Sequence, residues 1–338
     1  MSNRLILGAI VAAALCTPPA IQADTMLGAY VKSDGWSLSA MDEFNLATGK
    51  PMAVTNLFTN FDYHWGYLKY QSDNIISRGG VPLISWMPAT STRLNANLLP
   101  EIAAGQWDAY IDRWINGFKW WRSGVPAGSH SNIMLRFGHE FNGNWYPWGN
   151  DPENFKAAWQ HIHDRFEQAG INPYIEWVWC ANNADVDSVK DITRYYPGDA
   201  YVDWTSLDGY NWGSNYSFSS WKSFDEVFSA PYNKLIDNYP SKPILIAEVG
   251  APEPSDLPNP NYGQNGNDTD RHESKEAWVA NMFTRIEESY PAIRAVSWFN
   301  INKELNWALD QPNNTGLTAY KATTQSSHYS STYSPITQ

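Results

Sequence analysis

The chain contains eight short apolar runs, and most of them are separated by one segment with helical spacing. The runs cover residues 27–31, 53–60, 81–88, 133–140, 174–182, 202–210, 243–250 and 293–300. A strand followed by a helix, repeated around a closed parallel sheet, produces this alternation. We therefore predict a single α/β domain over residues 24–322 that folds as a (β/α)8 TIM barrel.

A doubly wound open sheet is the competing architecture. That fold commonly carries a GxGxxG phosphate loop after a strand, and no such loop follows any of the eight runs. Ionisable residues instead follow several different runs. A barrel accounts for this because all eight strand ends lie on one rim, where residues more than a hundred positions apart can meet.

Residues 100–124 have apolar positions at helical spacing, including Trp107, Trp114 and Trp121. The spacing predicts one helix that Gly124 ends. We expect its tryptophans to pack against the sheet and do not assign them to a ligand.

Two apolar runs end in a glutamate. Residues 133–137 lead into His139 and Glu140, and residues 243–247 lead into Glu248 before Gly250. Two carboxyls that face each other across a sugar bond can hydrolyse a glycoside, with retention at a separation of about 5–5.5 Å and inversion at about 6.5–9.5 Å. Taken alone, either glutamate could instead be an exposed loop carboxylate or a member of a structural ion pair.

The composition favours a neutral ligand with flat faces. The formal net charge is -12 and no basic cluster is present, which argues against nucleic acid or an anionic membrane as a partner. The chain has 18 Trp and 19 Tyr, more than we expect a core to need. An excess of rigid aromatic side chains predicts stacking surfaces, most simply for carbohydrate.

The first 23 residues have the organisation of a secretory signal peptide. Arg4 precedes an apolar core at 5–15, and Ala23 stands before Asp24. We expect a protein secreted to the periplasm or the medium, with no membrane association after cleavage. Cys180 is then the one remaining cysteine, which excludes an internal disulfide and predicts a buried, inert thiol. The polar stretch 323–338 is expected to be a frayed tail.

Four sequence blocks carry a family resemblance. They are RFGHEFNGNWYPWG at 136–149, VWCANN at 178–183, VDWTSLDGYNWG at 202–213 and AEVG at 247–250. In order and spacing they resemble glycoside hydrolase family 26, a family of retaining (β/α)8 enzymes. The resemblance implies Glu140 as the acid/base, Glu248 as the nucleophile and no cofactor. Aromatic neighbours such as Phe141, Trp145 and Tyr146 would desolvate Glu140 and favour its protonated form.

The resemblance also implies substrate-binding residues. Tyr210 is similar to a tyrosine that serves the nucleophile, and His139 belongs to the His-Glu pair of mannanases. The other residues that resemble subsite positions are His64, Trp145, Asp208 and Trp298, with Trp179 and Trp212 as weaker candidates. Each could instead have a local structural role. Trp298 is the favoured stacking platform because it lies toward the end of the eighth run.

Two other chemistries lack support in the sequence. His161 and His163 lie two residues apart on a predicted helix, so their side chains do not share a face, and we predict no metal site. A GxSxG nucleophile elbow is absent, which leaves an esterase without support.

Within the resemblance, the substrate stays open. The family consists mainly of endo-β-1,4-mannanases, with some mixed-linkage β-glucanases and β-1,3-xylanases. The prevalence of mannanases places β-mannan first, whereas LDGYNWG at 207–213 resembles the glucanase branch and places mixed-linkage β-glucan close behind. The His-Glu pair disfavours β-1,3-xylan. A different class of protein, a carbohydrate-binding barrel without activity, would be favoured by loss of either glutamate, and both are present. We expect the protein to be a monomer.

Overall fold

The computed structural model describes residues 24–186, 191–254, 274–310 and 315–335. The predicted signal peptide at 1–23 lies outside these residues, so its assignment stays a prediction.

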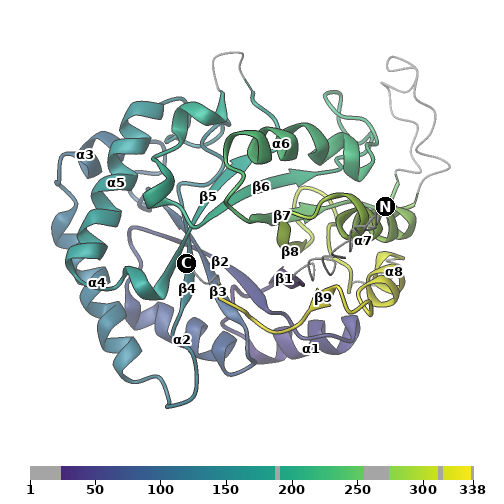
Figure 1. Cartoon of the computed structure of the whole chain (residues 1–338), viewed down its shortest axis with the longest axis horizontal. Helices are drawn as coiled ribbons and strands as arrows, with labels where there is room; N and C mark the ends of the chain where they lie inside the picture. The colour runs from purple at the N-terminus through teal and green to yellow at the C-terminus, as the bar shows by residue number, and fades with distance from the viewer. Residues whose placement is uncertain (1–23, 187–190, 255–273, 311–314, 336–338) are drawn as a thin grey trace, which may run out of the picture.

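Eight parallel strands close into a barrel, as predicted (Figure 1). Their bounds are β1 Thr25–Val31, β2 Val54–Asn60, β3 Val81–Met87, β4 Ile133–Phe137, β5 Ile175–Asn182, β6 Trp204–Tyr210, β7 Ile244–Gly250 and β8 Ile293–Asn300. Strand β1 closes the barrel because it pairs with β2 on one side and β8 on the other. Gly28 allows the close approach of β1 to β2, since a Cβ atom there would lie 2.7 Å from the carbonyl oxygen of Val54.

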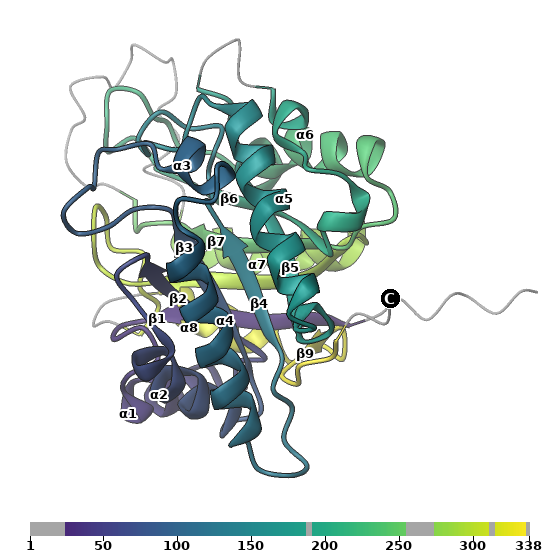
Figure 2. The same ribbon diagram turned by 90° about the vertical axis from the view of Figure 1, so that its left-hand side faces the viewer.

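Helices surround the barrel in the predicted order. Their bounds are α1 Leu38–Thr48, α2 Trp65–Ile76, α3 Leu99–Ala103, α4 Asp108–Ser123, α5 Pro152–Gln168, α6 Phe224–Asn238, α7 Lys275–Ser289 and α8 Gly316–Thr323. The side chain of Asp151 caps α5 by accepting from Asn154 N, and Figure 2 shows β4 flanked by α4 and α5.

One predicted helix is divided. Residues 100–124 form α3 and α4 rather than a continuous helix, because Gly105 adopts a positive φ of 76° between them. The connection from β5 to β6 has 3-10 turns at Ile192–Tyr195 and Asp199–Tyr201 in its described part.

Tryptophan fills much of the space between the barrel and its helices. Trp114 of α4 stacks on Trp86 of β3 with ring centroids 5.1 Å apart, which confirms the predicted packing of this helix. Eleven of the 18 tryptophans are at most 2% exposed. The aromatic excess therefore serves mainly the core, and its interpretation as carbohydrate-stacking surface was wrong for most of these residues.

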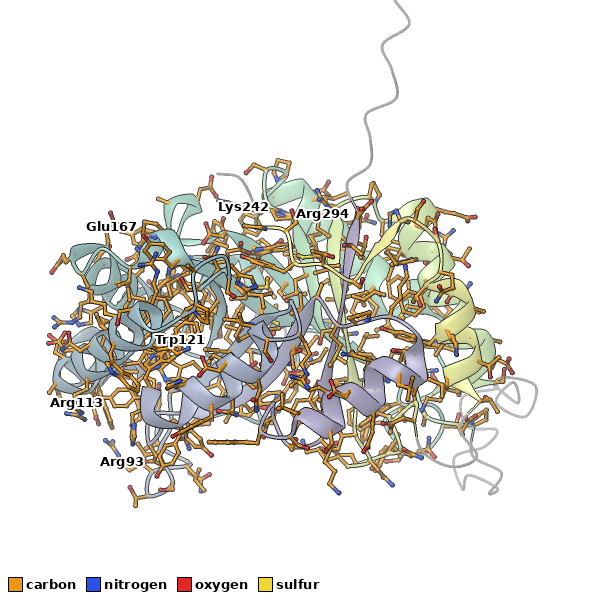
Figure 3. The ribbon with its side chains drawn as sticks, turned by 90° about the horizontal axis from the view of Figure 1, so that it is seen from below. Arg93, Arg113, Trp121, Glu167, Lys242 and Arg294 are labelled. Carbon is orange, nitrogen blue, oxygen red and sulfur yellow. The ribbon has the colours of Figure 1, made fainter. Side chains whose placement is uncertain are left out.

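The two ends of the barrel can be told apart by the residues that lie at the starts and at the ends of the strands. Lys242 precedes β7 and Arg294 lies near the start of β8, whereas Arg93 follows β3. Figure 3 shows Lys242 and Arg294 at one end of the molecule and Arg93 at the opposite end. Glu140 and Glu248 belong to the end where the strands finish, where (β/α)8 enzymes keep their active sites.

The C-terminal segment is packed, so the expectation of a frayed tail was wrong for residues 324–335. Strand β9, Tyr329–Ser330, pairs in parallel with the start of β1. The Tyr329 hydroxyl donates to the carbonyl oxygen of Phe283 in α7. The Tyr333 hydroxyl donates to Glu176 Oε1 over 2.7 Å, and Trp204 Nε1 donates to Oε2 of the same buried carboxyl. The segment therefore completes the end of the barrel where the strands begin.

We predict that Tyr333→Phe lowers the free energy of unfolding by about 1–3 kcal/mol, because a buried carboxyl loses one of its donors. Urea denaturation measures the change. Tyr70→Phe is the matched control, since Tyr70 is 58% exposed, and we expect it to stay within about 0.5 kcal/mol of the parent chain. Equal stability of the two variants would contradict this role of Tyr333.

Candidate active site

A cleft of about 590 Å³ lies at the end of the barrel where the strands finish. Both Glu140 and Glu248 line it, although 108 positions of sequence separate them. Aromatic side chains form most of the remaining wall, namely Trp145, Tyr146, Tyr210, Trp212, Phe218, Phe299 and Trp307. The structure thus brings the two predicted carboxyls to one concave, aromatic surface of the size that small ligands use.

The backbone directs Glu140 into this cleft through a tight turn after β4. Gly138 and Glu140 both have positive φ, 54° and 55°. The left-handed conformation costs a non-glycine residue about 1–2 kcal/mol. Two hydrogen bonds offset part of this: Glu140 N donates to the carbonyl oxygen of Cys180 over 2.9 Å, and Gly143 N donates to the carbonyl oxygen of Glu140 over 2.9 Å. Strain of this kind is often retained at functional sites.

The carboxyl of Glu140 is largely removed from water. Trp145 Nε1 donates to its Oε2 over 2.7 Å, and Asn182 Nδ2 donates to its Oε1 over 3.0 Å. Burial, followed by repulsion from Glu248, raises the pKa of Glu140 to about 7, although these two donors and Arg136 oppose the rise. The carboxyl can therefore hold or release a proton near neutral pH, which agrees with the desolvation expected from the sequence.

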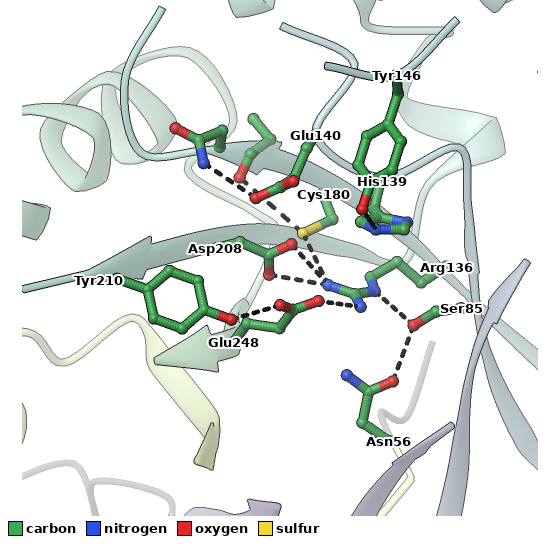
Figure 4. Close-up of polar contacts among 12 residues, drawn as sticks. Asn56, Ser85, Arg136, His139, Glu140, Tyr146, Cys180, Asp208, Tyr210 and Glu248 are labelled. Atoms are coloured by element: carbon green, nitrogen blue, oxygen red, sulfur yellow. Dashed lines mark hydrogen bonds and ion pairs between the residues drawn. The ribbon is translucent and has the colours of Figure 1, made fainter. Parts of the chain in front are cut away.

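Glu248 has a different environment (Figure 4). Arg136 Nη2 donates to its Oε1 over 2.6 Å, and the Tyr210 hydroxyl donates to its Oε2 over 2.6 Å. Burial and the charge of Glu248 raise the pKa of Tyr210 well above its ordinary value, so this phenol remains a donor. A guanidinium and a phenol on its two oxygens stabilise Glu248 as a carboxylate.

Arg136 is one of the site residues that the sequence reasoning missed. Its Nη1 donates to both carboxylate oxygens of Asp208, at 2.8 and 2.7 Å, and its Nε donates to Ser85 Oγ over 2.8 Å. Burial alone disfavours the guanidinium charge, but Asp208 and Glu248 raise the pKa of Arg136 well above its ordinary value. The sequence did contain a signal: an arginine inside the apolar run 133–137 must be paired when it is buried.

Two predicted substrate-binding residues lie behind the cleft wall. Asp208 is fully buried on Arg136, and His139 is 1% exposed with Nε2 3.2 Å from the Tyr146 hydroxyl. Burial, followed by the charge of Arg136, lowers the pKa of His139 well below its ordinary value, so the imidazole is neutral. The assignment of both as sugar-contacting residues was wrong for this conformation. They position Arg136 and Tyr146 instead.

Trp298 and His64 also lie away from the cleft lining. Trp298 is 1% exposed, packs against Trp278 of α7 and donates from Nε1 to the carbonyl oxygen of Trp307. Its assignment as the stacking platform was wrong, because it faces the helices. His64 caps α2 by accepting from Gly66 N over 3.0 Å. Its role toward a substrate stays a prediction.

The remaining candidates divide in the same way. Trp145 and Tyr210 line the cleft, as does the weaker candidate Trp212, whereas Trp179 is fully buried. Phe299 and Trp307 line the cleft near the end of β8 but were not among the predicted residues. Asn182 was also missed, although it lies within the VWCANN block.

Neither a metal cluster nor a membrane helix is found in the part of the chain that the structure describes. In those residues, no group of three or more His, Cys, Asp or Glu side chains could hold a metal ion. None of the described helices is long and apolar enough to cross a bilayer. The absence of a metal and of a cofactor from the reaction stays a prediction.

A parallel barrel whose strand ends bring two carboxyls into one aromatic cleft is the architecture of a (β/α)8-barrel glycoside hydrolase. The sequence model of glycosyl hydrolase family 26 matches residues 123–241. Endoglucanase H of Acetivibrio thermocellus is 32% identical over 292 residues, which are 84% of this chain and 29% of that protein. The chain belongs to glycoside hydrolase family 26, as its sequence blocks indicated.

Solved structures of similar fold include family 26 enzymes. The catalytic domain of an endo-β-1,4-mannanase from Bacillus sp. JAMB-750 has a TM-score of 0.64 at 19% identity, covering 91% of this chain and 87% of that chain. A β-mannanase from Bacteroides ovatus has a TM-score of 0.63 at 16% identity, covering 90% of each chain. At these identities, the structures establish the barrel fold alone.

The curated relatives are longer than the regions they share with this chain. The matches span 29% of Endoglucanase H, and 22% of a mannan endo-1,4-β-mannosidase from Caldalkalibacillus mannanilyticus that is 28% identical over 131 residues, or 36% of this chain. The chain therefore spans less than a third of the length of either relative.

We predict that Trp145→Phe raises the pKa of Glu140 further above its ordinary value. The substitution removes an N–H that favours the ionised carboxylate, whereas burial remains. Titration of the ¹³C-labelled carboxyl by NMR measures the effect. Trp120→Phe, an exposed position on α4, is the control that should leave the titration unchanged. A lowered or unaltered pKa in Trp145→Phe would contradict the role of this indole.

Proposed function

We propose that the chain is a retaining endo-β-glycanase that hydrolyses β-linked polysaccharide with Glu140 and Glu248. The observation that carries this proposal is the contrast between the two carboxyls within one cleft. Burial raises the pKa of Glu140 to about 7, whereas Glu248 accepts from a guanidinium and a phenol. Pairs of carboxyls with such different environments commonly divide the acid and nucleophile roles.

The proposed reaction has two steps. Protonated Glu140 gives its proton to the glycosidic oxygen while Glu248 attacks the anomeric carbon, so the sugar–oxygen bond breaks and a covalent glycosyl-enzyme forms. Glu140, now ionised, takes a proton from water as the water oxygen attacks the anomeric carbon and releases Glu248. Arg136 and Tyr210 hold the Glu248 carboxylate in place between turnovers.

The substrate proposal has two candidates, each with its own support. Endoglucanase H matches 84% of this chain, whereas the two proteins named mannan endo-1,4-β-mannosidases match 36% and 35%. The prevalence of mannanases in the family placed β-mannan first. Because of the difference in coverage, we now propose β-glucan as the first candidate substrate and β-mannan as the second. β-Mannan remains the second candidate because these relatives carry mannanase names.

Hydrolysis of lichenan, galactomannan, glucomannan, cellulose and β-1,3-xylan by the chain, with product lengths read by chromatography, ranks these substrates. β-1,3-Xylan is included because two relatives named β-1,3-xylanases are 21% and 22% identical. Products of many lengths early in the reaction are expected for internal attack. Release of one short product from the start would contradict the endo mode.

We also propose that the chain is exported. The proposal rests on the arrangement of Arg4, the apolar core at 5–15 and Ala23. N-terminal sequencing of protein recovered from the periplasm or medium is expected to begin at Asp24. Retention of residues 1–23 by an internal protein would contradict export.

Glu140→Gln is expected to lower kcat by about 10²- to 10⁴-fold on polysaccharide, because the glycosidic oxygen loses its proton donor. In the parent enzyme, kcat/KM should fall as the pH rises through about 7, since the raised pKa keeps Glu140 protonated only below that value. The variant should lose this limb of the pH profile. If the fall of kcat/KM above about pH 7 persists in Glu140→Gln, the titrating group is a residue other than Glu140.

Glu248→Ala is expected to abolish hydrolysis while oligosaccharide binding is preserved, because only the nucleophile is removed. In the parent enzyme, NMR of the first products should show the β-anomer before mutarotation, as retention requires. First appearance of the α-anomer would contradict a glycosyl-enzyme on Glu248. Binding by the parent chain without turnover of any polysaccharide would support the non-catalytic carbohydrate-binding barrel instead.

A further inference from the structure

Phe218 is a conspicuous exposed side chain in the cleft wall. It lies in the connection between β6 and α6, lines the same cleft as Glu140 and Glu248, and is 74% exposed. Leaving a phenylalanine ring in water forgoes the free energy that its burial would contribute. An exposed aromatic ring within a concave site is typical of a ligand contact.

The ring of Phe218 is held by two other aromatic side chains. It stacks on Tyr216 with centroids 5.1 Å apart and an interplanar angle of 11°, and it meets Trp212 edge-on at 6.1 Å. The Tyr216 hydroxyl donates to the carbonyl oxygen of Glu304, which ties this connection to the segment after β8. Tyr216 and Trp212 therefore hold the Phe218 ring in place while much of the ring stays exposed. Because the ring is already ordered, little conformational entropy is lost when a ligand stacks on it.

The hydrogen bonds of the loop fix its shape as well. Ser219 Oγ donates to the carbonyl oxygen of Gly213 over 2.7 Å, and Asn215 Nδ2 donates to the carbonyl oxygen of Trp212 over 3.0 Å. These contacts close the loop on itself on either side of Phe218. The loop conformation that leaves the Phe218 ring exposed is therefore held by internal hydrogen bonds.

A continuous aromatic wall connects Phe218 to the reaction centre. Tyr210, which donates to Glu248, lies 5.9 Å from Trp212 between ring centroids, and Trp212 lies 6.1 Å from Phe218. Phe218 is therefore one ring further from Glu248 than Trp212 is. A sugar that stacks there would belong to the same polymer as the sugar at Glu248, but would not be the unit that reacts.

We propose that Phe218 is the stacking platform of a distal sugar subsite, which takes one pyranose unit of a neutral β-linked polysaccharide away from the cleavage point. A flat apolar ring presents a face that suits the C–H face of a pyranose. This inference rests on the proposed function of the cleft as a polysaccharide site. It assigns Phe218 to binding and to the preference for chain length, with no part in bond cleavage.

The test measures binding apart from hydrolysis. In the inactive Glu248→Ala background, affinities for β-1,4-linked gluco- and manno-oligosaccharides of two to six units are measured by calorimetry, with and without Phe218→Ala. We expect about a tenfold loss of affinity for the longer ligands, which span the subsite, and no loss for disaccharides bound at the centre. Absence of a loss at every length would overturn the proposal, as would an equal loss at every length.

Two matched variants separate a stacking role from a structural one. Phe218→Trp keeps an aromatic face and should retain the affinity for long ligands, whereas a merely bulky apolar side chain, Phe218→Leu, should not. Trp120→Ala removes a similarly exposed aromatic residue from α4, outside the cleft, and should leave all affinities unchanged. Full affinity in Phe218→Leu would overturn the stacking role.

Kinetics of the otherwise unaltered enzyme provides the second readout. Phe218→Ala should raise KM for long substrates by about tenfold with kcat unchanged, because an interaction made equally in the ground and transition states is lost. A fall in kcat with KM unchanged would overturn the assignment. If the parent enzyme hydrolyses nothing, the proposed function fails, yet the calorimetric comparison still decides whether Phe218 binds sugar.

Discussion

The site depends on one buried cation. Arg136 lies inside the barrel, and its guanidinium contacts the carboxylates of Asp208 and Glu248. Removal of the guanidinium from water without a partner would cost several kcal/mol, and its contacts with the two carboxyls offset this cost. Burial raises the pKa of Asp208 well above its ordinary value, although the charge of Arg136 opposes the rise. Ser85 accepts from Arg136 and donates to Asn56, which extends the network across β4, β3 and β2. The position of Glu248 is thus built into the sheet itself.

The same cation makes the two cleft carboxyls unequal. Arg136 contacts Glu248 directly, whereas the donors to Glu140 among the described residues are the neutral Trp145 and Asn182. Burial is the first cause that raises the pKa of Glu140 to about 7, and repulsion from the Glu248 carboxyl in the same cleft adds to it. The asymmetry needed for acid and nucleophile roles arises from a single arginine that contacts one carboxyl and not the other.

The sequence predicts the barrel and the two carboxyls well because both depend on strand order and strand ends. It predicts the cleft wall poorly, and β8 shows why. Neighbouring residues of a strand face opposite sides, so an error of one position exchanges Phe299, which lines the cleft, for Trp298, which packs against α7. An apolar run that is buried on both faces shows no alternation of polar and apolar residues, so the sequence does not indicate which of its side chains face the cleft. Trp307 could not be predicted because its place depends on how a loop folds back.

The loop that carries Trp307 is held by a side chain from outside the cleft. Lys275 of α7 is fully buried and donates from Nζ to the carbonyl oxygens of Asn306, Trp307 and Ala308. Its three N–H donors match these three carbonyl acceptors, which satisfies the hydrogen-bonding capacity of the buried ammonium. Burial still lowers the pKa of Lys275 to about 7, although Glu253 and Asp310 oppose this change.

Trp307 in turn packs against Tyr210, the donor to Glu248, so a helix of the outer layer supports the geometry of the Glu248 carboxyl. The outer helices of this barrel therefore do more than cover the sheet, because one of them fixes a loop on which the arrangement of the cleft depends.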